Sequence, residues 1–172
     1  MIRMSFARIA LMVSFLVPVA GLCAEGDVIF ISDKNGCNVA NPFPQAGESI
    51  TWNGSCKAGV ADGEGVLQWF IDGKIADRYE GTLKDGWAEG KGTLTRAEGG
   101  KYAGTWKHSL QDGDGRYDAA DGSWYEGQWK DGQPHGHGQY QAPDGRTFSG
   151  EWVDGVYEGD GDGDDDDNPN RT

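Results

Sequence analysis

The sequence predicts an all-β protein: an elongated, twisted, single antiparallel sheet of tandem β-hairpins. Three observations carry this prediction. An aromatic residue recurs every 23 residues, at Tyr79, Tyr102, Tyr125 and Phe148. Each aromatic residue opens a stretch in which the side chains alternate with period two, as they do along a strand. The chain also contains 29 glycines without a collagen-like triplet, which indicates many tight turns.

Every repeat has the same internal order. An aromatic residue is followed by Gly, then by Trp or Leu, then by a short polar turn and Gly-x-Gly-x-aromatic. The two halves predict two antiparallel strands, so each repeat is a hairpin. Second turns such as Ala-Pro-Asp-Gly-Arg at 142–146 join one hairpin to the next. About five repeats are expected over residues 52–163, starting at positions 52, 79, 102, 125 and 148.

The glycines within the strands have a predicted packing role. A single sheet has no second layer, so its large rings need room on the sheet's own surface. Glycine on neighbouring strands would let a ring lie flat over the backbone, where it buries roughly 150–250 Å². Because glycine weakens a strand, the array is expected to be stable only when several hairpins stack.

Residues 1–24 have the layout of a secretory signal peptide. Arg3 and Arg8 precede an apolar run, and small residues lead to the expected cleavage site after Ala24. Lipidation at Cys23 and an uncleaved anchor are the alternatives. The protein is therefore expected to be exported, to a periplasmic or extracellular location.

Two cysteines remain in the mature chain, Cys37 and Cys56. In an oxidising compartment an even number of cysteines favours a disulfide, although two free thiols or a metal pair remain alternatives. Residues 25–51 would form an N-terminal lead-in, which the disulfide would hold over the exposed edge of the first hairpin. A lead-in without a function of its own is equally compatible with the sequence.

The formal net charge is −13, and removal of the two signal-peptide arginines leaves −15. This charge argues against nucleic acid and anionic membranes as partners, since both require clustered Lys and Arg. Asp160–Asp167 forms an acidic run near the end of the chain, and residues 164–172 are expected to form a disordered acidic tail. Weak calcium association with this run is a further hypothesis.

The sequence offers no catalytic constellation and no cofactor motif. It lacks a Gly-x-Ser-x-Gly elbow, a phosphate loop, and a Ser or Cys with a His and an acid in a shared context. His135 and His137 form a histidine pair, but no third histidine lies near them in the sequence, so solvated positions are the simpler interpretation. We therefore expect no enzymatic activity, no cofactor and no metal site.

Two surfaces are candidates for binding. The first is the aromatic face, which is either core alone or a groove for a peptide or glycan. The second is the row of turns within the hairpins, where exposed apolar residues would form a contact edge. The aromatic candidates are Tyr102, Trp106, Tyr125, Trp129, Phe148 and Trp152, with Tyr117 and Tyr140 on the same face; the turn candidates are Trp87, Leu110, Val156 and Tyr157.

The repeat resembles that of the MORN (membrane occupation and recognition nexus) family. The signature Tyr-Glu-Gly-x-Trp, a central Gly and Gly-x-Gly is nearly complete over 125–138. Cys56 and Leu83 depart from it by replacing Trp, and Ser109 departs from it by replacing the central Gly. The resemblance implies an elongated, curved sheet that serves as a scaffold or interaction surface. It favours a protein partner or a cell-envelope component, with a cell-wall or glycan-binding module as the alternative.

Overall fold

A computed structural model describes residues 29–159, which form fourteen strands and no helix. The predicted signal peptide, the acidic run and the predicted disordered tail lie outside these residues. Within the described part, no helix is long and apolar enough to cross a membrane. The strands are β1 (Phe30–Ser32), β2 (Asn38–Ala40), β3 (Glu48–Trp52), β4 (Cys56–Lys57), β5 (Val60–Ala61), β6 (Gly63–Ile71), β7 (Lys74–Lys84), β8 (Trp87–Thr95), β9 (Lys101–Lys107), β10 (Leu110–Asp118), β11 (Trp124–Lys130), β12 (Gln133–Gln141), β13 (Thr147–Val153) and β14 (Val156–Gly159).

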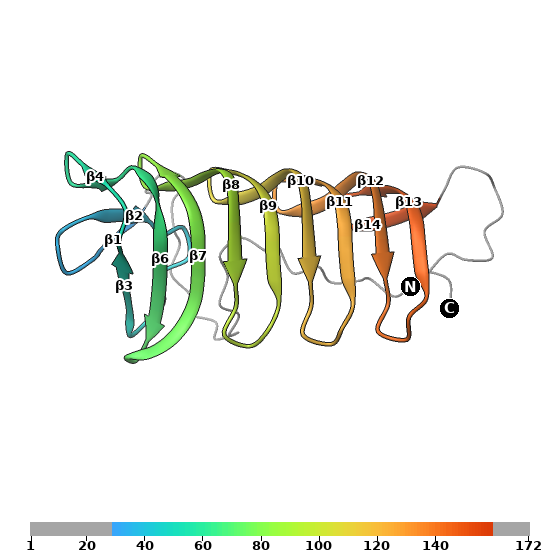
Figure 1. Cartoon of the computed structure of the whole chain (residues 1–172), viewed down its shortest axis with the longest axis horizontal. Coiled ribbons are helices and arrows are strands. Elements are labelled where there is room, and N and C mark those ends of the chain that lie inside the picture. The colour runs from blue at the N-terminus through green and yellow to red at the C-terminus, as the bar shows by residue number, and fades with distance from the viewer. Residues whose placement is uncertain (1–28, 160–172) are drawn as a thin grey trace, which may run out of the picture.

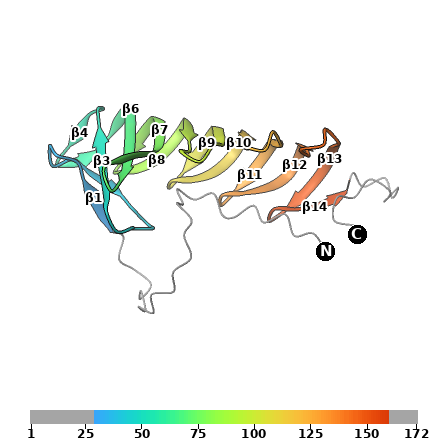
Figure 2. The same ribbon diagram turned by 90° about the horizontal axis from the view of Figure 1, so that it is seen from below.

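Ten of these strands form one antiparallel sheet in chain order, from β3 and β6 to β14. The sheet is elongated, and its hairpins follow one another along the long axis (Figures 1 and 2). The remaining strands form a small sheet of order β1-β2-β5-β4 at the N-terminal end. The all-β fold and the hairpin array predicted from the sequence are confirmed.

The turn within each hairpin has two residues, both with positive φ. Asp131 and Gly132, for example, have φ values of 48° and 82°, as in the type I′ turn that suits the twist of paired strands. In the third hairpin His108 and Ser109 take this conformation with φ values of 48° and 61°. Ser109 compensates for the missing glycine, because its Oγ accepts a hydrogen bond of 3.0 Å from the Ala88 amide.

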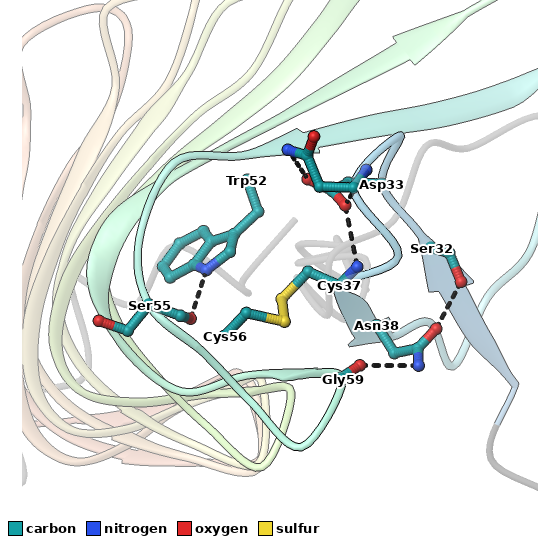
Figure 3. Close-up of a disulfide and its surroundings, with 9 residues drawn as sticks. Ser32, Asp33, Cys37, Asn38, Trp52, Ser55, Cys56 and Gly59 are labelled. Atoms are coloured by element: carbon teal, nitrogen blue, oxygen red, sulfur yellow. Dashed lines mark hydrogen bonds between the residues drawn. A yellow bond between two sulfur atoms is a disulfide. The ribbon is translucent and has the colours of Figure 1, made fainter.

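In the second to fifth hairpins a bulge in the second strand bends the hairpin. Gln111 pairs with Trp106 and Gly115 with Gly104, so residues 112–114 of β10 face a single residue of β9. Gly113, at the centre of this bulge, has a φ of 98°, which glycine adopts at little cost. The sheet consequently curves around its aromatic face instead of staying open, and Trp52 lies inside the curve (Figure 3).

The second glycine of each Gly-x-Gly in the first four hairpins makes room for an aromatic ring, which is Trp52 in the first hairpin and a tyrosine in the next three. Gly104 pairs with Gly115, which in turn pairs with Gly127, and the row of glycine pairs extends from β6 to β13. A Cβ added at Gly115 would lie 2.2 Å from the Tyr102 Oη and 2.5 Å from its Cζ. The tyrosine ring therefore covers the glycine backbone directly, as the sequence predicted.

Replacement of Gly115 by alanine should lower the free energy of unfolding by about 3 kcal/mol, because the buried Tyr102 ring cannot move away from the new methyl group. Urea unfolding would measure the loss. Gly122→Ala is the control: its Cβ would meet no atom within 4 Å, and only its φ of 86° opposes the change, at about 1 kcal/mol. Tyr102→Leu should suppress part of the Gly115→Ala effect in a double-mutant cycle, and purely additive losses would contradict the steric explanation.

The lead-in lies across the curved end of the first hairpin. A disulfide joins Cys37 to Cys56, with 5.9 Å between the two Cα atoms. The lead-in was expected to cover the edge of the first hairpin, and its last residues, 48–51, form most of β3, which pairs with β6 as the end strand of the large sheet. In addition β2 bonds to the turns, where the Asn38 and Ala40 amides donate to the carbonyls of Gly59 and Gly86 at 2.9 and 3.0 Å. Cys56 lies inside the curve, so the disulfide holds the lead-in there (Figure 3).

Candidate functional site

The aromatic candidates form the core of the array. All of them except Tyr117 have an exposed fraction of 7% or less, and alternating Tyr and Trp rings pack edge to face along the molecule. Tyr102, for example, lies 5.0 Å from Trp106 and 5.1 Å from Trp129, measured between ring centroids. Burial thus favours the interpretation of this face as core. The buried set comprises Tyr102, Trp106, Tyr125, Trp129, Tyr140, Phe148 and Trp152, whereas Tyr117 is half-buried.

The polar atoms of these rings are engaged inside the protein. Trp129 Nε1 donates to the Gly115 carbonyl at 3.0 Å, and Tyr102 Oη donates to the Thr105 carbonyl at 3.0 Å. Burial raises the pKa of the Tyr102 hydroxyl far above its ordinary value, so it stays protonated as a donor. A ligand would have to displace these bonds to use the rings for recognition.

Three of the four turn candidates are at least partly exposed, and one is buried. Trp87 and Leu110 are half-buried, and Val156 is 43% exposed. The expectation that Tyr157 lies exposed at a turn is wrong, because its exposed fraction is 7%. Its ring packs 5.2 Å from that of Trp152, and its Oη donates to the Ser149 carbonyl, so Tyr157 closes the C-terminal end of the aromatic core.

The opposite face of the sheet carries a groove that sequence reasoning missed. Two adjoining depressions of about 780 and 420 Å³ cross the first four hairpins and share Lys91, Ala103 and Gly104. The paired glycines form the floor, and charged side chains flank it. Only the register of the glycines, which places them in one row across the strands, would have signalled this groove. The charged residues that line it are Glu64, Glu80, Lys91, Asp114, Arg116 and Glu126.

The flanks of the groove are partly ordered by ion pairs. Arg116 contacts Asp118 at 2.8 Å and Glu126 at 2.9 Å, and its guanidinium lies 4.3 Å from the centre of the Trp124 ring. The hydrogen bond with Asp118 is the main cause that raises the pKa of Arg116, despite the opposing effect of desolvation. This wall of the groove therefore presents a fixed arrangement of both charges.

The histidines lie on the solvent side of the strands. His135 Nδ1 is 3.5 Å from Asp154, and His137 Nδ1 is 2.9 Å from Glu151. Among residues 29–159, no group of three or more His, Cys, Asp or Glu side chains is arranged to hold a metal ion. The hypothesis of calcium association concerns Asp160–Asp167, outside the described residues.

A buried carboxylate organises the lead-in beside the disulfide. Asp33 Oδ1 accepts hydrogen bonds from the Asn35 and Cys37 amides at 2.8 and 2.9 Å. Desolvation pushes the pKa of Asp33 up, but these hydrogen bonds outweigh it, and the net pKa lies below the ordinary value. The turn that presents Cys37 to Cys56 is thus fixed by an ionised side chain.

The repeat geometry agrees with a comparison of the sequence with family models. The MORN repeat model matches five segments, 54–73, 79–101, 102–124, 125–145 and 148–161, which together cover more than half of the chain. The chain belongs to the MORN repeat family. Comparison with curated proteins gives no match. MORN repeats generally mediate protein or membrane interactions, and the family is generally non-catalytic.

Proposed function

We propose that this MORN-repeat protein is an exported protein-binding or scaffolding module without catalytic activity. The groove over the glycine row carries this proposal, because it is long, floored by backbone and flanked by fixed charges of both signs. Such a surface suits an extended segment of another protein. The hairpins below it are held by a continuous aromatic core, so the groove is preorganised.

Export is supported by the layout of residues 1–24 and by the Cys37–Cys56 disulfide, since disulfides persist in oxidising compartments. We place the mature N-terminus at Glu25. The charge of −15 that results after removal of the two signal-peptide arginines disfavours anionic membranes. Glycan binding through the aromatic rings has less support, because those rings are buried.

Obstruction of the groove should abolish partner binding. Ala103 is exposed and lines both depressions, so Ala103→Trp would fill the groove without entering the core. Ser149 occupies the same position in the last repeat and lies outside the groove, which makes Ser149→Trp the matched control. We expect crosslinked affinity capture from cell-envelope fractions to recover a protein with the wild type and the control, and at least tenfold less with Ala103→Trp. Equal recovery with both variants, or no partner at all, would refute the proposal.

A further inference from the structure

The turns within the hairpins carry a row of lysines. Each of the first four hairpins has a lysine as the last residue before its turn, directly opposite the first residue after the turn. All four lysines are exposed, and none forms an ion pair within residues 29–159. Val153 replaces the lysine in the last hairpin. The row consists of Lys57, Lys84, Lys107 and Lys130.

A recess of about 430 Å³ lies between two of these lysines. Lys107 and Lys130 stand on neighbouring hairpins, about 10 Å apart along the array at the usual spacing of strands. Gly113 adds no side chain to the space between them. The recess spans β9 to β12 and is lined by Lys107, Asp112, Gly113, Gln128, Trp129, Lys130 and His135.

Two residues that line the recess differ from those at the same places in the other hairpins. The third residue after the turn is acidic in four hairpins, as Asp62, Glu89, Asp112 and Glu158, but in the fourth hairpin it is His135. The residue that precedes the tryptophan position is Ser, Thr or Glu elsewhere and Gln128 here. At the first position an acidic side chain is replaced by an imidazole, and at the second a shorter hydroxyl or an acidic side chain is replaced by an amide with two N–H donors.

The donors of the recess are available to a ligand. Gln128 Oε1 accepts a hydrogen bond of 3.0 Å from the His137 amide, and this bond orients the side-chain NH₂ group as the remaining donor. His135 Nδ1 is buried and lies 3.5 Å from Asp154 without a hydrogen bond, so the exposed part of this half-buried side chain lies elsewhere, on the side that includes Nε2. Asp112 is the sole acidic side chain of the described lining, against two lysines.

We propose that this recess binds a carboxylate of an acidic segment in a partner protein. The inference rests on the proposed function, and it specifies that the partner protein must present an acidic segment. Two ammonium groups, an amide and an imidazole suit a carboxylate, which accepts hydrogen bonds through both oxygens. A single recess in a strongly acidic chain does not match an anionic membrane, which attracts polybasic clusters.

The test uses the mature protein, an acidic peptide of alternating Glu and Gly, and NMR signals of the histidine side chains. Saturable shifts of His135 are expected on addition of the peptide, and inorganic phosphate should compete with it. Lys107→Gln and Lys130→Gln should each weaken binding about fivefold, as expected for a contact with an exposed charge. Lys84→Gln is the matched control, because Lys84 has the same place on a turn outside the recess.

The outcomes separate this inference from the proposed function. Loss of peptide binding in the Lys107→Gln/Lys130→Gln double variant, with thermal unfolding unchanged, would support the recess even if no partner had been captured. If Lys84→Gln weakened peptide binding equally, the effect would be one of general charge, and the proposal that the recess binds a carboxylate would be overturned. Capture of a partner that binds the double variant as well as the wild type would also overturn it, as would binding to anionic phospholipid vesicles without binding to the peptide.

Discussion

Replacement of Trp106 by alanine is expected to lower the free energy of unfolding by about 4 kcal/mol. The indole is 1% exposed, packs edge to face against Tyr79 and Tyr102, and donates to the Gly92 carbonyl at 3.1 Å. Its removal leaves a cavity in the aromatic core at the junction of two hairpins. Because hairpins in such an array stabilise one another through their interfaces, cooperativity should fall as well.

Urea unfolding followed by far-ultraviolet circular dichroism would measure this effect. Trp124→Ala is the control, because Trp124 is half-buried and packs against Arg116 outside the core; it should cost no more than about 1 kcal/mol. Trp106→Phe keeps a ring but loses the N–H donor, and an intermediate loss is expected. If Trp106→Ala lowered the free energy of unfolding by less than about 1.5 kcal/mol, the aromatic core would not be what holds the array together.

Removal of the disulfide is also expected to have a large effect. Cys37→Ser with Cys56→Ser should lower the free energy of unfolding by about 3 kcal/mol, because the bond closes a loop with a sequence separation of 19 residues. For a domain of this size the loss corresponds to a drop in Tm of roughly 10 °C. The released lead-in would also weaken the hydrogen bonds from Asn38 and Ala40 to the first two turns.

Thermal unfolding with and without a reducing agent would test this prediction. The reduced wild type should unfold at the same temperature as the double variant, and the double variant itself should not respond to the reductant. A wild type that is insensitive to complete reduction would show that the lead-in holds its place without the bond.

Much of the fold could be predicted from the sequence because it repeats. The spacing of Tyr79, Tyr102 and Tyr125 determines the hairpins, and the period-two alternation shows which residues share a face. The pairing of Cys37 with Cys56 could be predicted because they are the two cysteines that follow the expected signal peptide. The steric role of glycine also follows from the sequence, since a ring and a Cβ cannot occupy the same space.

The family resemblance implied a curved sheet, but the repeat pattern did not predict which residues bend it. In a flat hairpin the two glycines of Gly-x-Gly are equivalent, whereas in this structure Gly113 forms a bulge and Gly115 lies beneath a ring. The curvature also turns the second residue after each turn inward, which is why Tyr157 is buried although it stands beside a turn. Both the groove and the lysine recess depend on side chains from neighbouring hairpins, and their arrangement follows from this bending.

The indole hydrogen bonds give the array a direction. Trp106, Trp129 and Trp152 each donate to a glycine carbonyl of the hairpin that precedes them. Deletion of a preceding hairpin would leave a buried donor without an acceptor, whereas deletion of a following one would free only a carbonyl, which is tolerated more readily. The first two hairpins carry Cys56 and Leu83 at this position and need no predecessor. Arrays built in this way can be lengthened or shortened at the C-terminal end, while the N-terminal end must begin with hairpins of this special kind.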